Sequence, residues 1–307
     1  MLKVKSWFSA ARLRTLPLSI SGIIIGATLA HIHGYSNMLI FILALLATIS
    51  FQITSNFAND YGDGVKGTDN EHRVGPKRAL QSGLLSKKEL KIGIYISVII
   101  NVILIFCVVY TAFGIKNIPH LLLFIVLGML SIWAAIKYTV GDSAYGYRGL
   151  GDIFVFLFFG LLAVLGTMFL FTKFITVDSI LPAIAIGLLS TGVLNLNNLR
   201  DYESDKKSNK NTLVVKMGYE NGKIYHYSLL IVAFLSVLLF VILNFRSWQN
   251  ILCLIAFFPV VIHLLKVYRI NEPRMLDPEL KKIALSTFLL AVLFFLGYNN
   301  FFVNLVI

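Results

Sequence analysis

The sequence predicts an all-α integral membrane protein, a bundle of about nine transmembrane helices that forms a single domain over residues 1–307. Its mean hydropathy is +0.80. Only 14% of its residues are charged, against 57% that are hydrophobic, a composition outside the range of soluble globular chains. The apolar stretches show no alternation of period two and are too long for barrel strands, so each is interpreted as a helix near the ~20 residues that a span needs. They cover residues 15–33, 38–58, 90–113, 118–137, 152–172, 176–197, 224–244, 250–268 and 283–305.

The start of the chain and the sixth stretch differ from the other apolar stretches. The basic, aromatic start MLKVKSWFSAARLRT predicts a short helix that lies in the membrane interface before the first span. The sixth stretch is the weakest of the nine, because Asn195 and Asn197 make its end polar. Cys107 and Cys253 both lie inside apolar stretches without a partner at ligand spacing, so we expect core packing rather than a disulfide or a zinc site.

The distribution of Lys and Arg predicts the orientation of the bundle. Of the 27 such residues, all except Lys116, Lys173 and Arg246 lie at the N-terminus, in alternate loops or at the adjoining span ends. The positive-inside rule then places the N-terminus and both long polar loops in the cytoplasm and the C-terminus outside, in the cytoplasmic (inner) membrane. The net charge of +12 therefore reports topology and attraction to the lipid bilayer. Basic residues scattered over short loops argue against nucleic acid as a partner.

Five of the 15 acidic residues gather in two clusters, each directly after a long apolar run. In the first, SNFANDYGDGVKGTD, a continued helix would place four side chains on one face at spacings i, i+3, i+4 and i+7. These are Asn56, Asn59, Asp60 and Asp63. Gly62, Gly64 and Gly67 are expected to end the helix. The chain then turns, and Asp69 returns toward the same point.

The second cluster, NLNNLRDYESDKK, repeats this geometry with Asn198, Asp201 and Asp205 at i, i+3 and i+7. We expect the two clusters to face each other across the bundle, as in a weak internal duplication. Like charges at this spacing repel, so the arrangement indicates a bound cation. Oxygen ligands without His or Cys favour Mg²⁺, which proteins hold with a few carboxylates and substrate phosphates. The candidate metal ligands are Asn59, Asp60, Asp63, Asp69, Asn198, Asp201 and Asp205.

The ordinary alternative is that these carboxylates are solvated helix ends that balance the basic loops. One isolated Asp at a membrane edge is often that. Lone counter-charges, however, need no repeated spacing on two helix ends, which favours a site for two Mg²⁺ ions and a diphosphate.

Basic and aromatic side chains near the clusters are candidates for binding substrate, although lipid anchoring explains many single Lys residues. Arg14, Arg78 and Lys137 are closest to the predicted site. The central segment KYTVGDSAYGYRGLGD adds three tyrosines whose faces can stabilise a cation, with an interfacial aromatic belt as the alternative. The substrate-binding candidates are Arg14, Asn56, Arg73, Lys77, Arg78, Lys137, Tyr145 and Arg200, and the catalytic candidates are Asp63, Asp201 and Tyr138.

Taken together, NDY-x-D-x-x-x-G-x-D and NN-x-RD-x-x-x-D resemble the two metal motifs of the UbiA superfamily of intramembrane aromatic prenyltransferases. The resemblance covers nearly the whole chain. It is closest to the branch that acts on 1,4-dihydroxy-2-naphthoate in menaquinone synthesis. Gly67 stands where other members carry the last Asp of the first motif, and Asp69 replaces it, as in the naphthoate branch. Asp142, Ser143 and Ala144 stand where relatives often have a basic residue and a proline.

The resemblance implies a nine-helix bundle with a central cavity open to the bilayer. It also implies transfer of a polyprenyl group from polyprenyl diphosphate to 1,4-dihydroxy-2-naphthoate, with loss of diphosphate and CO₂, giving demethylmenaquinone. Mg²⁺ on both motifs would neutralise the diphosphate, and the nearby basic residues would add positive charge. Two alternatives stay open. One is another aromatic acceptor, such as 4-hydroxybenzoate or homogentisate; the other is a secondary transporter, which would place its polar groups at the bilayer midplane.

Overall fold

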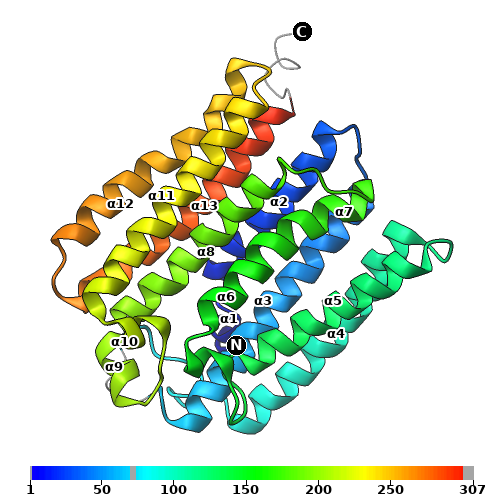
Figure 1. Ribbon diagram of the computed structural model, residues 1–307. Helices are drawn as coiled ribbons and strands as arrows, with labels where there is room; N and C mark the ends of the chain where they lie inside the picture. Colours follow the sequence, from blue (N-terminus) through cyan, green and yellow to red (C-terminus); the bar gives the residue numbers. More distant parts are fainter. Residues whose placement is uncertain (1, 70–73, 300–307) are drawn as a thin grey trace.

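The computed structural model describes residues 2–69 and 74–299, and every regular element in this part of the chain is a helix (Figure 1). The elements are α1 (Leu2–Ala11), η1 (Leu13–Thr15), α2 (Leu16–Ile32), α3 (Met38–Lys66), α4 (Lys87–Phe113), α5 (Ile118–Lys137), η2 (Tyr145–Arg148), α6 (Gly151–Val155), η3 (Phe156–Gly166), α7 (Thr167–Thr172), α8 (Ile180–Arg200), α9 (Tyr202–Lys207), α10 (Leu213–Met217), α11 (Tyr219–Leu243), η4 (Trp248–Phe257), α12 (Phe258–Arg269), η5 (Pro273–Leu276) and α13 (Asp277–Tyr298).

The described residues contain nine helices that are long and apolar enough to cross a membrane, which confirms the predicted architecture of an integral membrane bundle. Their bounds differ from the predicted ones mainly at the polar ends. The sixth runs to Arg200, beyond the two asparagines that made its end look polar, and the ninth begins at Pro273 rather than near residue 283. The predicted N-terminal helix is α1, which packs against α3; its place in the membrane interface stays a prediction.

Helix α3 carries the first acid cluster, and both of its ends have a local cause. The Asn37 side chain caps the start by accepting a hydrogen bond from the amide of Ile40. Only Gly67, with φ of 74°, ends the helix. Gly62 and Gly64, which we expected to share that role, are helical instead. A Cβ on Gly62 would lie 2.6 Å from Thr139 Oγ1, so this glycine admits the segment after α5 at close range.

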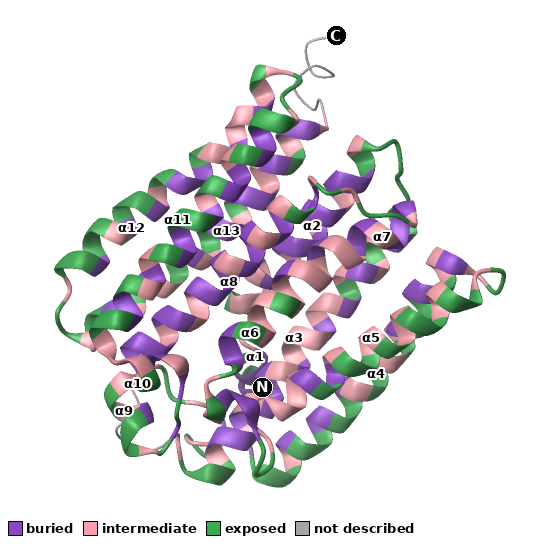
Figure 2. Ribbon diagram, viewed as in Figure 1, coloured by how far each residue is buried: buried purple, intermediate pink, exposed green. Residues whose placement is uncertain are grey.

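Helix α8 lies at the centre of the bundle and is buried along most of its length (Figure 2). It packs against α11, η3 and α13. Its approach to η3, a π-helix, is close at one point: a Cβ on Gly160 would lie 2.6 Å from the Cα of Gly187. Backbones at this separation leave no room for any side chain, so these two glycines join η3 and α8 directly.

The α4–α5 hairpin lies at the edge of the bundle opposite α12 (Figure 1). Many residues on its outer face are exposed and apolar (Figure 2). Only Ile132 and Ala134 of α5 are buried. Exposed residues such as Ile99, Ile103 and Leu122 are surfaces that a lipid bilayer accommodates. The loops that contain the two acid clusters and the central tyrosine segment all lie at one end of the bundle, the lower end in Figure 1.

Candidate active site at the polar end of a central cavity

A cavity of about 370 Å³ lies inside the bundle. Most of its wall is apolar, and includes Ile105 and Val109 of α4, Phe124 of α5, and Phe158 and Leu162 of η3. The end nearest the acid clusters is polar instead. The polar residues there are Arg12, Asn59, Asp63, Arg78, Tyr138, Asn197 and Lys210. One cavity therefore joins an apolar chamber to a charged end, which suits a ligand with a hydrocarbon tail and an anionic head.

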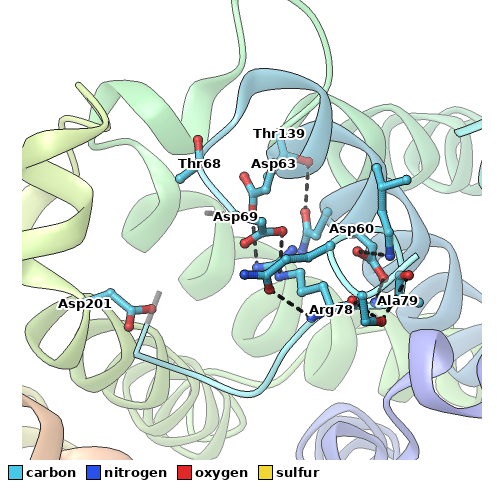
Figure 3. A network of polar contacts seen from close by, with 12 residues as sticks. Asp60, Asp63, Thr68, Asp69, Arg78, Ala79, Thr139 and Asp201 are labelled. Atoms are coloured by element: carbon cyan, nitrogen blue, oxygen red, sulfur yellow. Dashed lines mark hydrogen bonds and ion pairs between the residues drawn. The ribbon is translucent and has the colours of Figure 1, made fainter. Parts of the chain in front are cut away.

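Asp63 and Asp69 of the first cluster meet at one guanidinium (Figure 3). Arg78 Nη2 lies 2.9 Å from Asp63 Oδ2, and Arg78 Nε lies 3.1 Å from Asp69 Oδ2. The turn at Gly67 makes this possible, since the amide of Thr68 then bonds to the carbonyl of Asp63 at 3.0 Å. In Figure 3, Asp201 of the second cluster faces this group from a separate segment of the chain.

Asn59 and Asp60, adjacent in sequence, have different surroundings. Asn59 lines the cavity and accepts a hydrogen bond from Thr139 Oγ1 at 3.2 Å. The Asp60 carboxylate is turned toward the next loop, where it accepts from the backbone amides of Ala79 at 3.1 Å and Leu80 at 3.5 Å. We therefore infer that Asp60 holds the turn at residues 79 and 80, which positions Arg78. This role differs from the predicted contact with a metal ion.

Asn56, a predicted substrate contact, does not line the cavity. Its Nδ2 donates to the carbonyl of Ala11 at 2.8 Å and to Thr15 Oγ1 at 3.2 Å. These bonds join α3 to the end of α1 and to η1, so Asn56 fixes the N-terminal segment. The four side chains expected on one face thus divide between the cavity and two structural contacts.

The second cluster lies where α8 ends and α9 begins, with Asp201 as the joining residue. Asn197 lines the cavity, whereas Asn198, the predicted ligand, is buried away from it. Arg200 does not line the cavity, and its guanidinium instead holds three neighbouring side chains by hydrogen bonds. Its guanidinium donates to both carboxylate oxygens of Asp201 at 2.9 and 2.6 Å, to Asn197 Oδ1 at 2.6 Å and to Asp277 Oδ1 at 2.6 Å.

Lys210 is the main site residue that the sequence analysis missed. It is buried, lines the cavity, and its Nζ lies 3.5 Å from Asp205 Oδ1. Burial lowers the Lys210 pKa, but the attraction of Asp205 and Asp63 raises it above the ordinary value, so the ammonium stays charged. Burial raises the pKa of Asp205 to about 6, although Lys210 opposes this shift. In the sequence Lys206 and Lys207 stand close to it, and the run KKSNK does not distinguish Lys210 from them.

The remaining basic candidates that the structure describes do not line the cavity. Arg14 is exposed, and Arg12, whose φ of 48° changes the chain direction before α2, lines the cavity in its place. Lys77 is exposed and Lys137 is half-buried, and neither is part of the cavity wall. Arg73 lies outside the described residues.

Three tyrosines of the central segment gather near the charged end. Tyr138 and Tyr145 line the cavity with ring centroids 5.4 Å apart, and the Tyr145 ring stacks on Phe154 at 3.9 Å. Burial raises the pKa of Tyr138 to about 12, so its phenol stays protonated at neutral pH. The Tyr147 hydroxyl donates to Asp63 Oδ1 at 2.7 Å, and Lys66 Nζ lies 3.9 Å from its ring centroid.

The donors at this end of the cavity fit Mg²⁺ by their chemistry. Carboxylate and amide oxygens from both clusters are present, without the sulfur or imidazole ligands that favour zinc. Within the described residues no three acidic, His or Cys side chains form a ready-made metal centre. Arg78, Arg200 and Lys210 form ion pairs with the carboxylates of the two clusters. Asp205 Oδ2 is buried with no hydrogen-bond partner, which is an available position for a metal contact.

The chain is similar to known enzymes over most of its length. A 1,4-dihydroxy-2-naphthoate octaprenyltransferase of Haemophilus influenzae is 45% identical over 298 residues and covers 96% of both chains. The enzyme of that name from Escherichia coli is 40% identical over 295 residues, covering 96% of this chain and 95% of its own. The one from Mycobacterium tuberculosis is 35% identical over 250 residues, 81% of each chain.

Solved structures of UbiA homologs share the fold at low sequence identity. One from Archaeoglobus fulgidus, bound to GPP and Mg²⁺, has a TM-score of 0.64 and 16% identity, covering 94% of this chain and 98% of its own. One from Aeropyrum pernix has a TM-score of 0.67 and 14% identity, covering 90% and 97%. The model of the UbiA prenyltransferase family matches residues 19–286. The protein described here belongs to the UbiA prenyltransferase family.

Proposed function

We propose that the protein transfers a polyprenyl group from polyprenyl diphosphate to 1,4-dihydroxy-2-naphthoate, with release of diphosphate and CO₂, giving demethylmenaquinone. The observation that carries the proposal is the cavity, whose apolar chamber ends at Asp63 of the first cluster and Asn197 of the second, with the cations Arg78 and Lys210 in the same part of its wall. Relatives at 40–45% identity over nearly the whole chain bear the name of this activity, with an octaprenyl tail.

The polar end of the cavity has residues that can bind a diphosphate. Arg78 and Lys210 are cations that line the cavity. They can bind the non-bridging oxygens of the diphosphate as negative charge grows on this leaving group. Bound Mg²⁺ would neutralise diphosphate charge there, held by Asn59, Asp63 and Asp69 on one side and Asn197, Asp201 and Asp205 on the other. Oxygen donors on both sides and the unpartnered Asp205 Oδ2 support this metal assignment.

The aromatic wall beside that end suits the carbon chemistry. Tyr138, Tyr145 and Phe158 line the cavity, and aromatic rings of this kind can stabilise an allylic cation. The apolar residues beyond them hold the isoprenoid tail and exclude water, which would otherwise capture the cation. The electron-rich ring of the acceptor then forms the new carbon–carbon bond.

The acceptor and the loss of CO₂ are tested together. Purified protein incubated with Mg²⁺, octaprenyl diphosphate and carboxyl-labelled 1,4-dihydroxy-2-naphthoate should release one labelled CO₂ for each prenyl group transferred. Mass spectrometry should find a product that carries the tail and lacks the carboxylate. Parallel reactions with 4-hydroxybenzoate and homogentisate serve as controls. Efficient prenylation of either in place of the naphthoate would refute the acceptor, and a product that kept its carboxylate would refute the decarboxylation.

We also infer that the polar end faces the cytoplasm and that the C-terminus is outside the inner membrane, on the distribution of Lys and Arg. In a variant with Cys107 and Cys253 replaced, single cysteines at the exposed positions Lys66 and Lys206 should react with a membrane-impermeant reagent only from the cytoplasmic side. A cysteine at Val177, which is 85% exposed in the loop before α8, should react only from the other side. Labelling of Lys66 and Val177 from one side would contradict the orientation.

A further inference from the structure

A chain of four buried polar side chains crosses the interior of the bundle behind the cavity wall, joining one residue from each of α8, α11, α12 and α13. Asn195 Oδ1 lies 3.1 Å from His226 Nδ1, His226 Nε2 lies 2.8 Å from His263 Nε2, and His263 Nδ1 lies 3.0 Å from Glu279 Oε2. Asn195 and both imidazoles have no exposed surface, and Glu279 is 3% exposed. Lys282 Nζ contacts the second Glu279 oxygen at 2.6 Å.

The hydrogen bonds in this chain can all run in one direction. A carboxylate that already accepts from Lys282 accepts again from His263 Nδ1–H. His263 Nε2 is then an acceptor for His226 Nε2–H, which leaves His226 Nδ1 as an acceptor. The amide nitrogen of Asn195, buried without a partner in its present orientation, supplies the missing donor when the amide turns over. Both imidazoles are then neutral, and each bond depends on the next.

The chain of hydrogen bonds from Asn195 to Glu279 is one tether between α8 and α13, and Arg200 forms a second. Asp277 and Glu279 lie in the same first turn of α13. Asp277 accepts from Arg200, which also binds Asn197 and Asp201. The two tethers therefore reach α8 at Asn195 and Arg200, on either side of Asn197, the residue that faces the cavity.

Such a chain is expensive to maintain inside a membrane-spanning bundle. Each polar group lost water on folding, and a hydrophobic core of similar volume would be at least as stable. A fixed chain of hydrogen bonds does, however, specify one rotation and one height for α8 relative to α11–α13. Apolar packing alone specifies these less sharply.

We propose that Asn195, His226, His263 and Glu279 are positioning residues, which fix the end of α8 so that Asn197 and Asp201 reach the diphosphate–metal site in the correct geometry. This rests on the proposed function, since it concerns the same site. The relation matches the outer hydrogen bonds of metal centres, which orient ligands without touching the ion.

Glu279→Leu and Glu279→Gln separate positioning by hydrogen bonds from the effect of charge. Leucine removes the acceptor of His263, whereas glutamine keeps an oxygen at the same distance and removes only the charge. Glu279→Leu should raise the KM for Mg²⁺ about 10- to 100-fold, and Glu279→Gln should stay near the wild-type value. Asn195→Ala, which breaks only the last link, should raise the same KM and is the second test if Glu279→Leu does not fold.

A readout without turnover accompanies the kinetics. The thermal stabilisation of each purified variant by Mg²⁺ plus inorganic diphosphate should move to higher Mg²⁺ concentration in step with the KM. Asn250→Ala is the matched control. Asn250 of η4 is buried and donates to the carbonyl of Gly297 at 2.9 Å, near the end of α13 that is far from Glu279. It should lower the melting temperature and leave the Mg²⁺ dependence unchanged.

The outcomes separate this proposal from the function on which it rests. If Glu279→Leu and Asn195→Ala are destabilised like Asn250→Ala, with a wild-type Mg²⁺ dependence in an active enzyme, the residues are only structural and the positioning role is wrong. If Glu279→Gln fails as badly as Glu279→Leu, charge rather than geometry matters, and the proposal is again wrong. A wild-type protein without prenyl transfer and without stabilisation by Mg²⁺ would overturn both the function and the tether.

Discussion

Asp63→Ala should lower the rate of prenyl transfer about 100-fold or more while the protein stays folded. Asp63 lies where the two clusters meet. It binds Arg78 and Tyr147 directly, and its charge acts on both Lys210 and Asp205. Its loss removes a candidate ligand and weakens the hold on every other charged group at the polar end. Single-turnover rates over a range of Mg²⁺ concentrations measure the effect.

The matched control for this substitution is Asp142→Ala. Asp142 is exposed in the central loop, so its removal changes the net charge by the same amount without touching the cavity. Asp60→Asn is a second comparison, because Asp60 holds the backbone of residues 79 and 80 and should lower stability more than the Mg²⁺ response. Near-normal turnover of Asp63→Ala at low Mg²⁺ would remove Asp63 from the site.

Arg78→Ala should destabilise the metal-free protein by about 3–5 kcal/mol, because it leaves two buried carboxylates without their cation. The side chain of Arg78 is 10% exposed, and those of Asp63 and Asp69 are 3% and 0% exposed. Mg²⁺ should restore much of the lost stability by taking the place of the guanidinium between the carboxylates. Thermal unfolding in chelator and in excess Mg²⁺ measures both effects on one preparation.

Arg148→Ala is the control for charge alone, since Arg148 is exposed on the central loop, and it should unfold like the wild type. Arg78→Lys tests geometry, because an ammonium cannot bind two carboxylates as a planar guanidinium does. An Arg78→Ala variant that is as stable as the wild type in chelator would mean that the Asp63–Arg78–Asp69 contacts contribute nothing to the fold.

The sequence was sufficient to predict the fold of this protein, because a bilayer leaves few alternatives to a long apolar helix. It predicted nine spans and the return of the chain toward Asp63 after a glycine. The end of the sixth span was less accurate. Asn195 and Asn197 look like a polar boundary in sequence, but in the structure one binds a buried histidine and the other lines the cavity. Such contacts come from other helices, and spacing along one helix does not reveal them.

The candidate site itself stays a prediction, but the structure shows why several of the predicted side chains do not line the cavity. Helical spacing selected Asn198, whereas the helix breaks at Asp201 and Asn197 faces the cavity. The left-handed conformation of Arg12 similarly brings it, rather than Arg14, to the wall. Lys210 reaches the site through a turn after α9, in which its amide bonds to the carbonyl of Asp205 at 2.9 Å. Spacing along the sequence does not reveal any of these three backbone features.

The contact between Gly160 and Gly187 has a consequence for motion. The backbones of η3 and α8 touch there, so sliding or tilting one against the other would cause collisions that no side chain can absorb by rotating. The contact therefore resists relative motion of η3 and α8. The facing wall is α5, which buries only Ile132 and Ala134 and loses little contact when it swings outward. A long isoprenoid chain that enters from the bilayer would therefore move the α4–α5 hairpin outward, while α8 keeps its position.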